Sequence, residues 1–161
     1  MKPIINWKVR VYDEMNVYEL YEMLKLRSEV FVVEQNCVYQ DLDGLDSRCI
    51  HIFGWSNDGR LAAYARILPE GVDAYEVKDA AAGRHGGIGR VVVSPAFRGI
   101  GHDLMAKTLE VYDDLVGSNI PCIIHAQAHL KHFYETHGFV QTSEIYLIDG
   151  IDHIEMTRPG L

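Results

Sequence analysis

The stretch Val91-Val92-Val93-Ser94-Pro95-Ala96-Phe97-Arg98-Gly99-Ile100-Gly101-His102 decides the fold. Its three β-branched residues predict a buried strand that Pro95 ends, and the apolar spacing that follows predicts a helix over 100–116. Free backbone N–H groups at a helix N-terminus attract anions, and glycines let the backbone approach a ligand closely. A strand, a glycine turn and a helix are also a common structural connection, so the stretch alone leaves both interpretations open.

A second strand and helix follow in the sequence. An apolar strand is expected over 121–125 and a helix over 128–137, and Leu130, Phe133 and Tyr134 would share one face of that helix. Tyr134 is either a core residue with a satisfied hydroxyl or a proton donor in a cleft. Spacing alone favours the core.

The rest of the chain predicts strands mixed with helices. Strands are expected over 6–12, 49–56, 61–68, at Phe139-Val140 and around Ile154, a helix over 16–32, and irregular segments over 34–47 and 69–87. Asn57-Asp58-Gly59 is a hairpin turn signal. This order predicts one α/β (α+β) domain, a sheet covered by helices.

Length and composition restrict the class of protein. The chain has 161 residues, which fits a single domain spanning 1–161, and it is 48% apolar with a net charge of −8. It has no basic run, so we expect no nucleic-acid partner, and an acidic surface favours a cationic substrate such as an amine. No apolar run approaches the roughly 18 residues of a membrane span, and no signal-peptide core follows Met1, so a cytoplasmic location without a membrane partner is expected.

Metal and thiol chemistry are weakly supported. Cys37, Cys49 and Cys122 are an odd set without a close pair, so we expect them to be reduced packing residues. Cys37 has no organised partner that would make it a nucleophile. His125, His129 and His132 could approach one another, but no flanking carboxylate set accompanies them, and no metal site is expected.

Together, the two strand–helix units resemble the GNAT N-acetyltransferase superfamily. Its acyl-CoA motif is a strand, an Arg/Gln-x-x-Gly-x-Gly/Ala turn and a helix, followed by a second strand and helix that end in Tyr-x-x-x-Gly-Phe. Tyr134 to Phe139 match that ending.

Further stretches are similar to the ElaA family within this superfamily. They are Leu26 to Gln35, Tyr39 to Asp43, His51, Gly89 to Val93, Glu144 to Tyr146 and Gly150 to Met156. The resemblance covers about residues 6–157. It implies a mixed, V-shaped central sheet flanked by helices, and acetyl-CoA (acyl-CoA) as co-substrate without a metal.

The resemblance also implies roles for individual residues. The thioester would lie along Val91, Val92 and Val93, and the pyrophosphate on the turn from Arg98 to His102, which includes Gly99, Ile100 and Gly101. Gln127 falls where many relatives have Asn, and Phe133 lies beside the cofactor. Tyr134 matches the general acid that protonates the departing CoA thiolate.

One departure from the family pattern concerns the turn. A Leu-plus-apolar pair usually follows the turn arginine by eight and nine positions, but Leu104-Met105 follow Arg98 by six and seven. The turn is therefore two residues short, and Asp103 adds a negative charge beside it. We expect fewer N–H donors for the pyrophosphate and weak CoA binding.

The segment from Glu34 to Asp46, with His51, is the expected wall on the acceptor side. The resemblance includes Glu34, Gln35, Asp43 and His51 as substrate-binding residues, whose roles it does not fix. Glu34, Asp43 or His51 is either a base or amine anchor, or a surface charge and helix-end partner.

The function expected from this resemblance is an acyltransferase. Acetyl would pass from acetyl-CoA to a primary amine of a small molecule or peptide by direct attack in a ternary complex. Two alternatives stay open: an acyl-homoserine-lactone-synthase-like enzyme, because 27–35 resembles that family too, and a catalytically weak acyl-CoA-binding module. The sequence does not decide whether the chain forms a homodimer.

Overall fold

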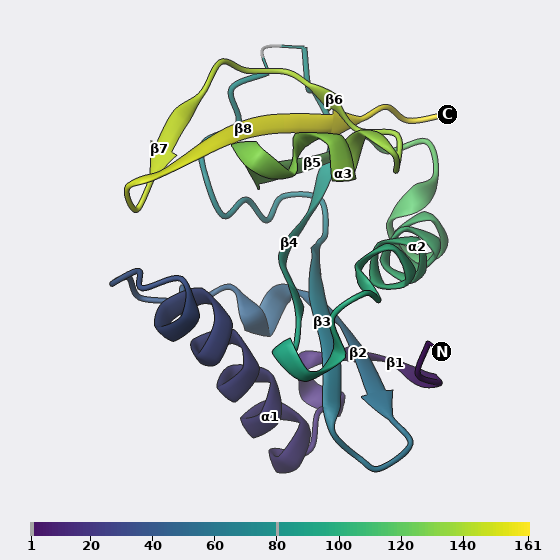
Figure 1. Cartoon of the computed structure of the whole chain (residues 1–161). Coiled ribbons are helices and arrows are strands. Elements are labelled where there is room, and N and C mark those ends of the chain that lie inside the picture. Colours follow the sequence, from purple (N-terminus) through teal and green to yellow (C-terminus); the bar gives the residue numbers. More distant parts are fainter. Residues whose placement is uncertain (1, 80) are drawn as a thin grey trace.

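The computed structural model describes residues 2–79 and 81–161 (Figure 1). Within these residues the strands are β1 (Ile5–Val11), β2 (Ile50–Ser56), β3 (Leu61–Leu68), β4 (Gly86–Val93), β5 (Cys122–Gln127), β6 (Val140–Gln141), β7 (Tyr146–Ile148) and β8 (Ile151–Arg158). The α-helices are α1 (Val17–Arg27), α2 (Gly101–Tyr112) and α3 (Lys131–Glu135).

All of these strands form one sheet that opens into a V. Its order is β1-β2-β3-β4-β5-β8-β6, and β7 pairs with β8 beside this path. β4 and β5 are parallel and pair at Gly86 and Gly87, opposite Cys122 and Ile123. Beyond Gly87 the described pairing between them ends and the two strands diverge (Figure 1).

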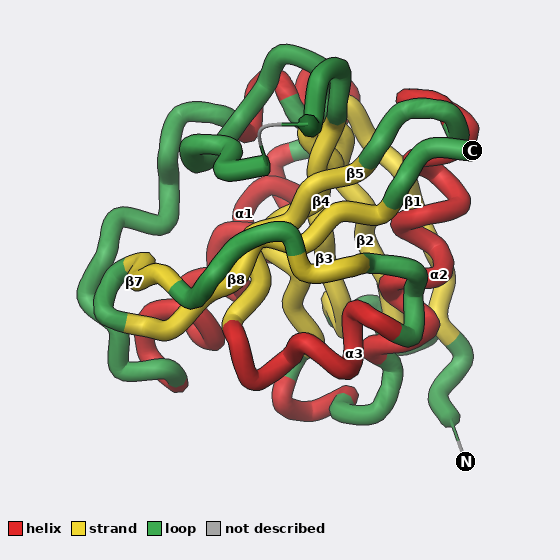
Figure 2. The backbone as a smooth tube through the Cα atoms, turned by 90° about the horizontal axis from the view of Figure 1, so that it is seen from above, coloured by secondary structure: helices red, strands yellow, loops and turns green. Residues whose placement is uncertain are grey.

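Helices cover both faces of the sheet (Figures 1 and 2). Met23 and Leu26 of α1 pack with Phe53, Tyr64 and Val92 on one face. On the other face α2 packs against side chains from β2, β3 and β5. Because apolar side chains on each face are buried by a helix, the two halves of the V are held rigidly around the gap between them.

The first helix positions the chain that enters this gap. Asn16 caps α1: its side chain accepts from the Glu19 N–H at 2.7 Å, and the Glu19 carboxylate accepts from the Asn16 N–H at 3.0 Å. After Arg27 the helix continues as a π-helical segment, Ser28–Glu34. π-Helical turns are frequent at functional sites. The residues at the end of this one lie at the opening between the two halves of the sheet.

The sequence predictions agree with most of this fold. The strand at 61–68 is confirmed, and the mixed, V-shaped sheet flanked by helices is confirmed as well. The segments expected to be helical over 16–32 and 100–116 are helical over almost their whole length, but they change from α-helix to π-helix after Arg27 and Tyr112. The helix expected over 128–137 is a 3-10 turn followed by α3. Position 80, in the segment expected to be irregular, lies outside the described residues.

No helix in the described part of the chain is long and apolar enough to cross a bilayer.

Candidate active site

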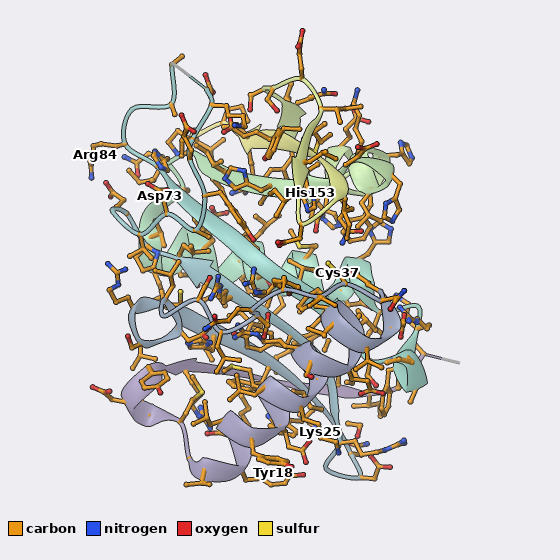
Figure 3. The ribbon with its side chains drawn as sticks, turned by 90° about the vertical axis from the view of Figure 1, so that its left-hand side faces the viewer. Tyr18, Lys25, Cys37, Asp73, Arg84 and His153 are labelled. Carbon is orange, nitrogen blue, oxygen red and sulfur yellow. The ribbon has the colours of Figure 1, made fainter. Side chains whose placement is uncertain are left out.

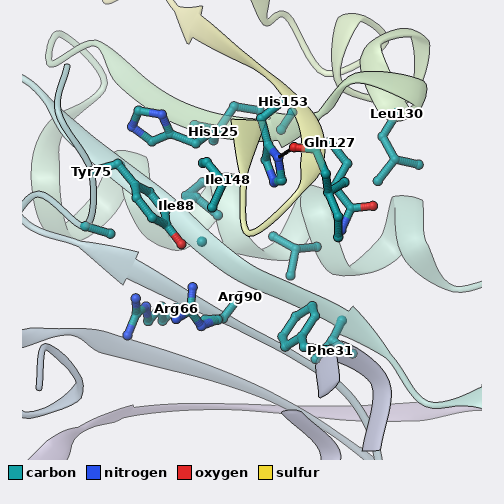
Figure 4. A pocket seen from close by; sticks show the side chains of 18 of the residues that line it. Phe31, Arg66, Tyr75, Ile88, Arg90, His125, Gln127, Leu130, Ile148 and His153 are labelled. Atoms are coloured by element: carbon teal, nitrogen blue, oxygen red, sulfur yellow. Dashed lines mark hydrogen bonds between the residues drawn. The ribbon is translucent and has the colours of Figure 1, made fainter. Parts of the chain in front are cut away.

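A cavity of about 430 Å³ lies between the diverging strands β4 and β5 (Figure 4). One wall is β4, the opposite wall is formed by β5 and β8, and the segments around 30–39 and 72–75 line its sides. The predicted site residues that line it are Val91, Val92, Val93, Arg98, Gln127, Tyr134, Glu34 and Gln35. The structure thus brings together residues from four separate stretches of sequence.

Strand β4 carries a bulge where it lines the cavity. Arg66 pairs with Gly89 and Tyr64 with Val92, so β3 advances by two residues while β4 advances by three. Arg90 lies in this extra position with φ of 51°, a left-handed conformation that is rare for residues with a Cβ. Since the described pairing with β5 ends at Gly87, the described strands give the backbone of β4 beyond it no partner on the cavity side. Backbone N–H groups in such a position can polarise a carbonyl oxygen.

Tyr134 reaches the cavity from α3. Its side chain belongs to the core under α2 and is only 7% exposed, yet it also lines the cavity. Burial raises the pKa of Tyr134 to about 12, so the hydroxyl keeps its proton near neutral pH. The described residues give this hydroxyl no hydrogen-bond partner, so it is available as a donor. Tyr134 is therefore a core residue and a cavity residue at once.

Two contacts join the π-helical end of the first helix to the opposite wall. The Arg98 guanidinium donates to the Glu34 carboxylate, and Gln127 donates to Gln35 at 3.3 Å. Arg98 is 58% exposed, so this ion pair is accessible to a competing anion. Both contacts lie at one mouth of the cavity and draw its walls together.

In the turn after β4, Arg98 lines the cavity and Gly99 to His102 do not. Gly99 has φ of +104°, and α2 begins at Gly101 without a side-chain cap. The first intrahelical bond runs from the Leu104 N–H to the Ile100 carbonyl at 3.0 Å, which leaves the N–H groups before it unbonded within the helix. Asp103 is paired with Lys2 at 3.0 Å.

His102 and Phe133 meet beside this turn. Their ring centroids are 4.7 Å apart, and His102 Nδ1 lies 2.9 Å from His137 Nε2. A Cβ at Gly101 would be 3.5 Å from the Phe133 ring, so the start of α2 packs directly on α3. Neither Phe133 nor the residues from Gly99 to His102 line the cavity itself.

The other half of the cavity is rich in aromatic and histidine side chains. Tyr39, Tyr75, His125 and His153 line it, and Figure 4 shows the two histidines pointing into it from β5 and β8. From the sequence, none of these four is expected to bind the substrate or take part in catalysis. Cys37, labelled in Figure 3, also lines the cavity, and its Sγ lies 3.6 Å from the carbonyl oxygen of Asp149.

His125 is committed to a neighbour. Its Nδ1 lies 2.5 Å from the Tyr146 hydroxyl, and its ring packs edge-on against Tyr75 with centroids 5.2 Å apart. Burial lowers the pKa of His125 to about 4. The ring is therefore neutral near pH 7 and a weak proton acceptor.

A buried network of charges underlies this half of the cavity. It joins three arginines to three aspartates: Arg27, Arg66, Arg90, Asp41, Asp43 and Asp46. Asp41 receives Arg27 at 2.9 Å and Arg90 at 2.8 Å, so the network holds the bulge of β4 in place. The arginines and the aspartates that they bind are far apart in sequence. No local sequence pattern predicts that these charged side chains are buried.

Asp43, expected at the acceptor, belongs to this network and does not line the cavity. Arg66 donates to both of its oxygens, at 2.9 and 2.5 Å. Burial alone would raise the pKa of Asp43, but the hydrogen bonds and charge of Arg66 outweigh it and lower the pKa to about 2. The carboxylate is occupied, and we do not retain it as an amine anchor.

His51 is likewise enclosed in the fold, with 0% of its surface exposed. Its Nε2 lies 2.8 Å from the Asp46 carbonyl, which can only accept, so Nε2 carries the proton and Nδ1 accepts from the Tyr64 hydroxyl at 2.7 Å. Burial lowers the pKa of His51. Both nitrogens are used, so the expectation that His51 contacts the acceptor finds no support in its position.

The described residues contain no group of three or more His, Cys, Asp or Glu side chains arranged to hold a metal ion.

Comparison with known proteins decides the family. The profile of the acetyltransferase (GNAT) domain matches residues 33–158. The chain belongs to the GNAT acetyltransferase family. Within this family it is 46% identical over 159 residues to protein ElaA of Escherichia coli K12, covering 96% of this chain and 97% of ElaA.

Solved GNAT structures agree with the fold. The crystal structure of E. coli ElaA matches with a TM-score of 0.81 at 45% identity, over 96% of this chain and 99% of that one. An acyl-CoA N-acyltransferase from Pseudomonas aeruginosa matches with a TM-score of 0.82 at 40% identity and the same coverage. The AHL synthase LasI matches with a TM-score of 0.70 at 13% identity, over 96% of this chain and 89% of that one, which shows a shared fold alone. The GNAT domain and fold support an acyl-CoA-dependent transferase.

Proposed function

We propose that this GNAT protein transfers an acetyl group from acetyl-CoA to a primary amine of a small molecule or peptide. The observation that carries the proposal is the bulge at Arg90, which faces a cavity that Tyr134 also lines. Thioester aminolysis needs a donor at the carbonyl oxygen and an acid at the leaving sulfur. The bulge and the tyrosine supply these two groups on neighbouring walls.

Acetyl-CoA would enter at the mouth that Arg98 and Gln127 line. The pyrophosphate would accept from the N–H groups at the start of α2 and from Arg98, while the thioester would lie along Val91 to Val93. Backbone N–H groups of β4 at the bulge would polarise the carbonyl as charge develops on its oxygen. The amine would approach from the opposite half of the cavity, attack the carbonyl carbon and displace the thiolate, which takes the proton of Tyr134.

A turnover assay tests this proposal. Acetyl-CoA is incubated with a panel of primary amines, free thiol is followed with time, and the acetylated amine is identified by mass spectrometry. Enzyme-dependent thiol release that requires the amine supports the proposal. Binding of acetyl-CoA without turnover of any amine would instead indicate an acyl-CoA-binding module, which the Glu34–Arg98 pair and the short turn would favour.

The Glu34–Arg98 pair predicts opposite effects of its two members on CoA affinity. Arg98→Ala removes a charge-assisted contact and is expected to weaken CoA about tenfold. Glu34→Gln removes the carboxylate that competes with the pyrophosphate for Arg98 and should tighten binding a few-fold. Calorimetric titration with CoA at one salt concentration measures both.

The double variant Arg98→Ala, Glu34→Gln is the matched control. If Glu34 acts only through Arg98, its substitution has no effect once Arg98 is absent. Weaker CoA binding by Glu34→Gln alone would show that the carboxylate supports the site in another way.

The short turn predicts weak binding of CoA. Each N–H group lost from the turn forgoes a charge-assisted bond of about 1.5–3 kcal/mol, or roughly ten- to a hundredfold in affinity. We expect a dissociation constant in the high-micromolar range, which insertion of Gly-Lys after Gly99 should lower. Since Lys2 already pairs with Asp103, the substitution Asp103→Gly should have the smaller effect.

The contrary outcome is equally measurable. α2 begins at Gly101, so its unbonded N–H groups could already replace those missing from the turn. Low-micromolar binding by the wild type, weakened by the insertion, would show that they do.

A further inference from the structure

The histidine on β8 has the geometry of a proton acceptor. We infer that His153 is the general base of this enzyme, and that its Nε2 removes a proton from the ammonium form of the acceptor amine. This inference rests on the proposed acetyl transfer and adds the residue that makes the amine nucleophilic. Figure 4 shows the His153 ring pointing from β8 into the cavity, on the side opposite β4.

The tautomer of His153 follows from its hydrogen bond. Nδ1 lies 2.7 Å from the carbonyl oxygen of Ile151. A carbonyl oxygen only accepts, so Nδ1 carries the proton and Nε2 has a free lone pair. The described residues give Nε2 no hydrogen-bond partner, and the ring lines the cavity. A backbone carbonyl therefore fixes both the tautomer and the direction of the base.

The position of His153 suits the direction of attack. On the adjacent strand its partner in register is Gln127, which lines the same cavity and contacts Gln35 at the mouth used by the cofactor. The β4 bulge, where the thioester carbonyl would lie, is on the opposite wall. An amine between β8 and β4 would thus have its nitrogen between the base and the carbonyl carbon.

In the described part of the chain, His153 lacks the tyrosine hydroxyl contact that engages His125, which also lines the cavity. His125 is half-buried, its Nδ1 is engaged by Tyr146, and burial lowers its pKa to about 4. Tyr146 also approaches the His153 ring, with centroids 6.4 Å apart, and leaves Nε2 free. The other titratable or charged groups that line the cavity are Glu34, Cys37, Tyr39, Arg66, Asp73, Tyr75, Arg90, Arg98, His129, Tyr134 and Asp149. The charges of Arg66 and Arg90 are balanced by the aspartates of the buried network.

The proton balance of the reaction is complete with these groups. His153 Nε2 accepts one proton from the ammonium, and the freed nitrogen pair forms the C–N bond as the carbonyl π pair moves to oxygen. Return of that pair breaks the C–S bond, and the thiolate takes the Tyr134 proton. The second proton on nitrogen passes to the Tyr134 phenolate, and the His153 imidazolium releases its proton to solvent. An ammonium and a thioester become an amide, a thiol and a proton.

Two amines of different basicity test this role. Propylamine is almost fully protonated at neutral pH, whereas trifluoroethylamine is largely neutral and needs no base before attack. With saturating acetyl-CoA, His153→Gln should reduce kcat/KM for propylamine about a hundredfold at pH 7. The loss should shrink as the pH rises, and it should be small for trifluoroethylamine at pH 7 and above. Imidazole added to His153→Ala should restore part of the propylamine rate.

Controls separate a base from a structural residue. His125→Gln is the matched variant, expected to lack the difference between the two amines, and calorimetry with CoA checks that each variant keeps its cofactor site. If the wild type is active, an equal loss of kcat/KM for both amines at all pH values, or no loss for either, would overturn the assignment of His153. A difference between the amines in His125→Gln alone would transfer the role to His125. If the wild type binds acetyl-CoA but acetylates neither amine, both the proposed acetyl transfer and the role of His153 as its base are contradicted.

Discussion

Tyr134→Phe is expected to lower kcat by roughly 10²- to 10⁴-fold while CoA affinity stays nearly unchanged. The phenylalanine ring fills the same space in the core but lacks the proton that the thiolate needs. In the folded protein the hydroxyl has no described partner, so removing it breaks no protein hydrogen bond. The change should therefore appear in the rate and hardly in the melting temperature.

Steady-state kinetics with acetyl-CoA and an amine acceptor measures this effect, with single-turnover rates to confirm that chemistry limits kcat. Tyr112→Phe is the matched control, because the Tyr112 hydroxyl donates to the Pro121 carbonyl at 2.8 Å and lies outside the cavity lining. That variant should lose stability and keep its rate. If Tyr134→Phe also keeps its rate with chemistry limiting, Tyr134 has no role as an acid.

The framework of this fold could be predicted because it depends on local patterns. Period-two alternation predicts β1, an apolar run predicts β3 and a β-branched run predicts β4, and glycines and prolines mark where elements end. The cofactor half of the site follows from the same patterns with the family resemblance, and the structure places Val91 to Val93, Arg98, Gln127 and Tyr134 around one cavity or its mouth. Their roles there stay predictions.

The bulge of β4 could not be predicted from the sequence. Glycine is the usual signal for a left-handed position, and here the residue is Arg90, flanked by Gly89, which has no such conformation. The conformation is imposed by tertiary contacts: Arg90 donates to the Asp41 carboxylate at 2.8 Å and to the Asp41 carbonyl at 2.9 Å. A local pattern contains no information about a partner 49 positions away.

The acceptor half was predicted least well for a related reason. Charged residues are usually exposed, so a segment rich in aspartate suggests a solvated wall. Asp43 is an exposed residue, but its carboxylate is paired with the buried Arg66 of β3. His51 is enclosed because it bonds Tyr64 and the Asp46 carbonyl. His153 could have been noticed, since alternation in the tail predicts a strand that presents it on one face. Only the carbonyl of Ile151 shows which nitrogen is free.

The buried network predicts the largest effect on stability. Arg27 is fully buried, donates to Asp41 at 2.9 Å and to Asp46 at 2.7 Å, and Arg27→Met leaves both carboxylates short of a partner in a poorly solvated site. Removing one member of a buried ion pair costs about 3–5 kcal/mol. Equilibrium unfolding in urea should show this loss, and the melting temperature should fall by about 6–20 °C for a chain of this size.

Arg84→Met is the matched control, because Arg84 also makes two bonds of 2.9 Å to one carboxylate, Glu70, but is 75% exposed. Water solvates the carboxylate that remains, so the unfolding midpoint of this variant should hardly move. If both variants lose the same free energy of unfolding, burial does not increase the contribution of the Arg27 ion pairs to stability. The loss of Arg27 should also disturb the active site, because Asp41, its partner, holds Arg90 at the bulge. A partly folded Arg27→Met protein should therefore lose turnover before it loses CoA binding, since the pyrophosphate turn lies outside the network.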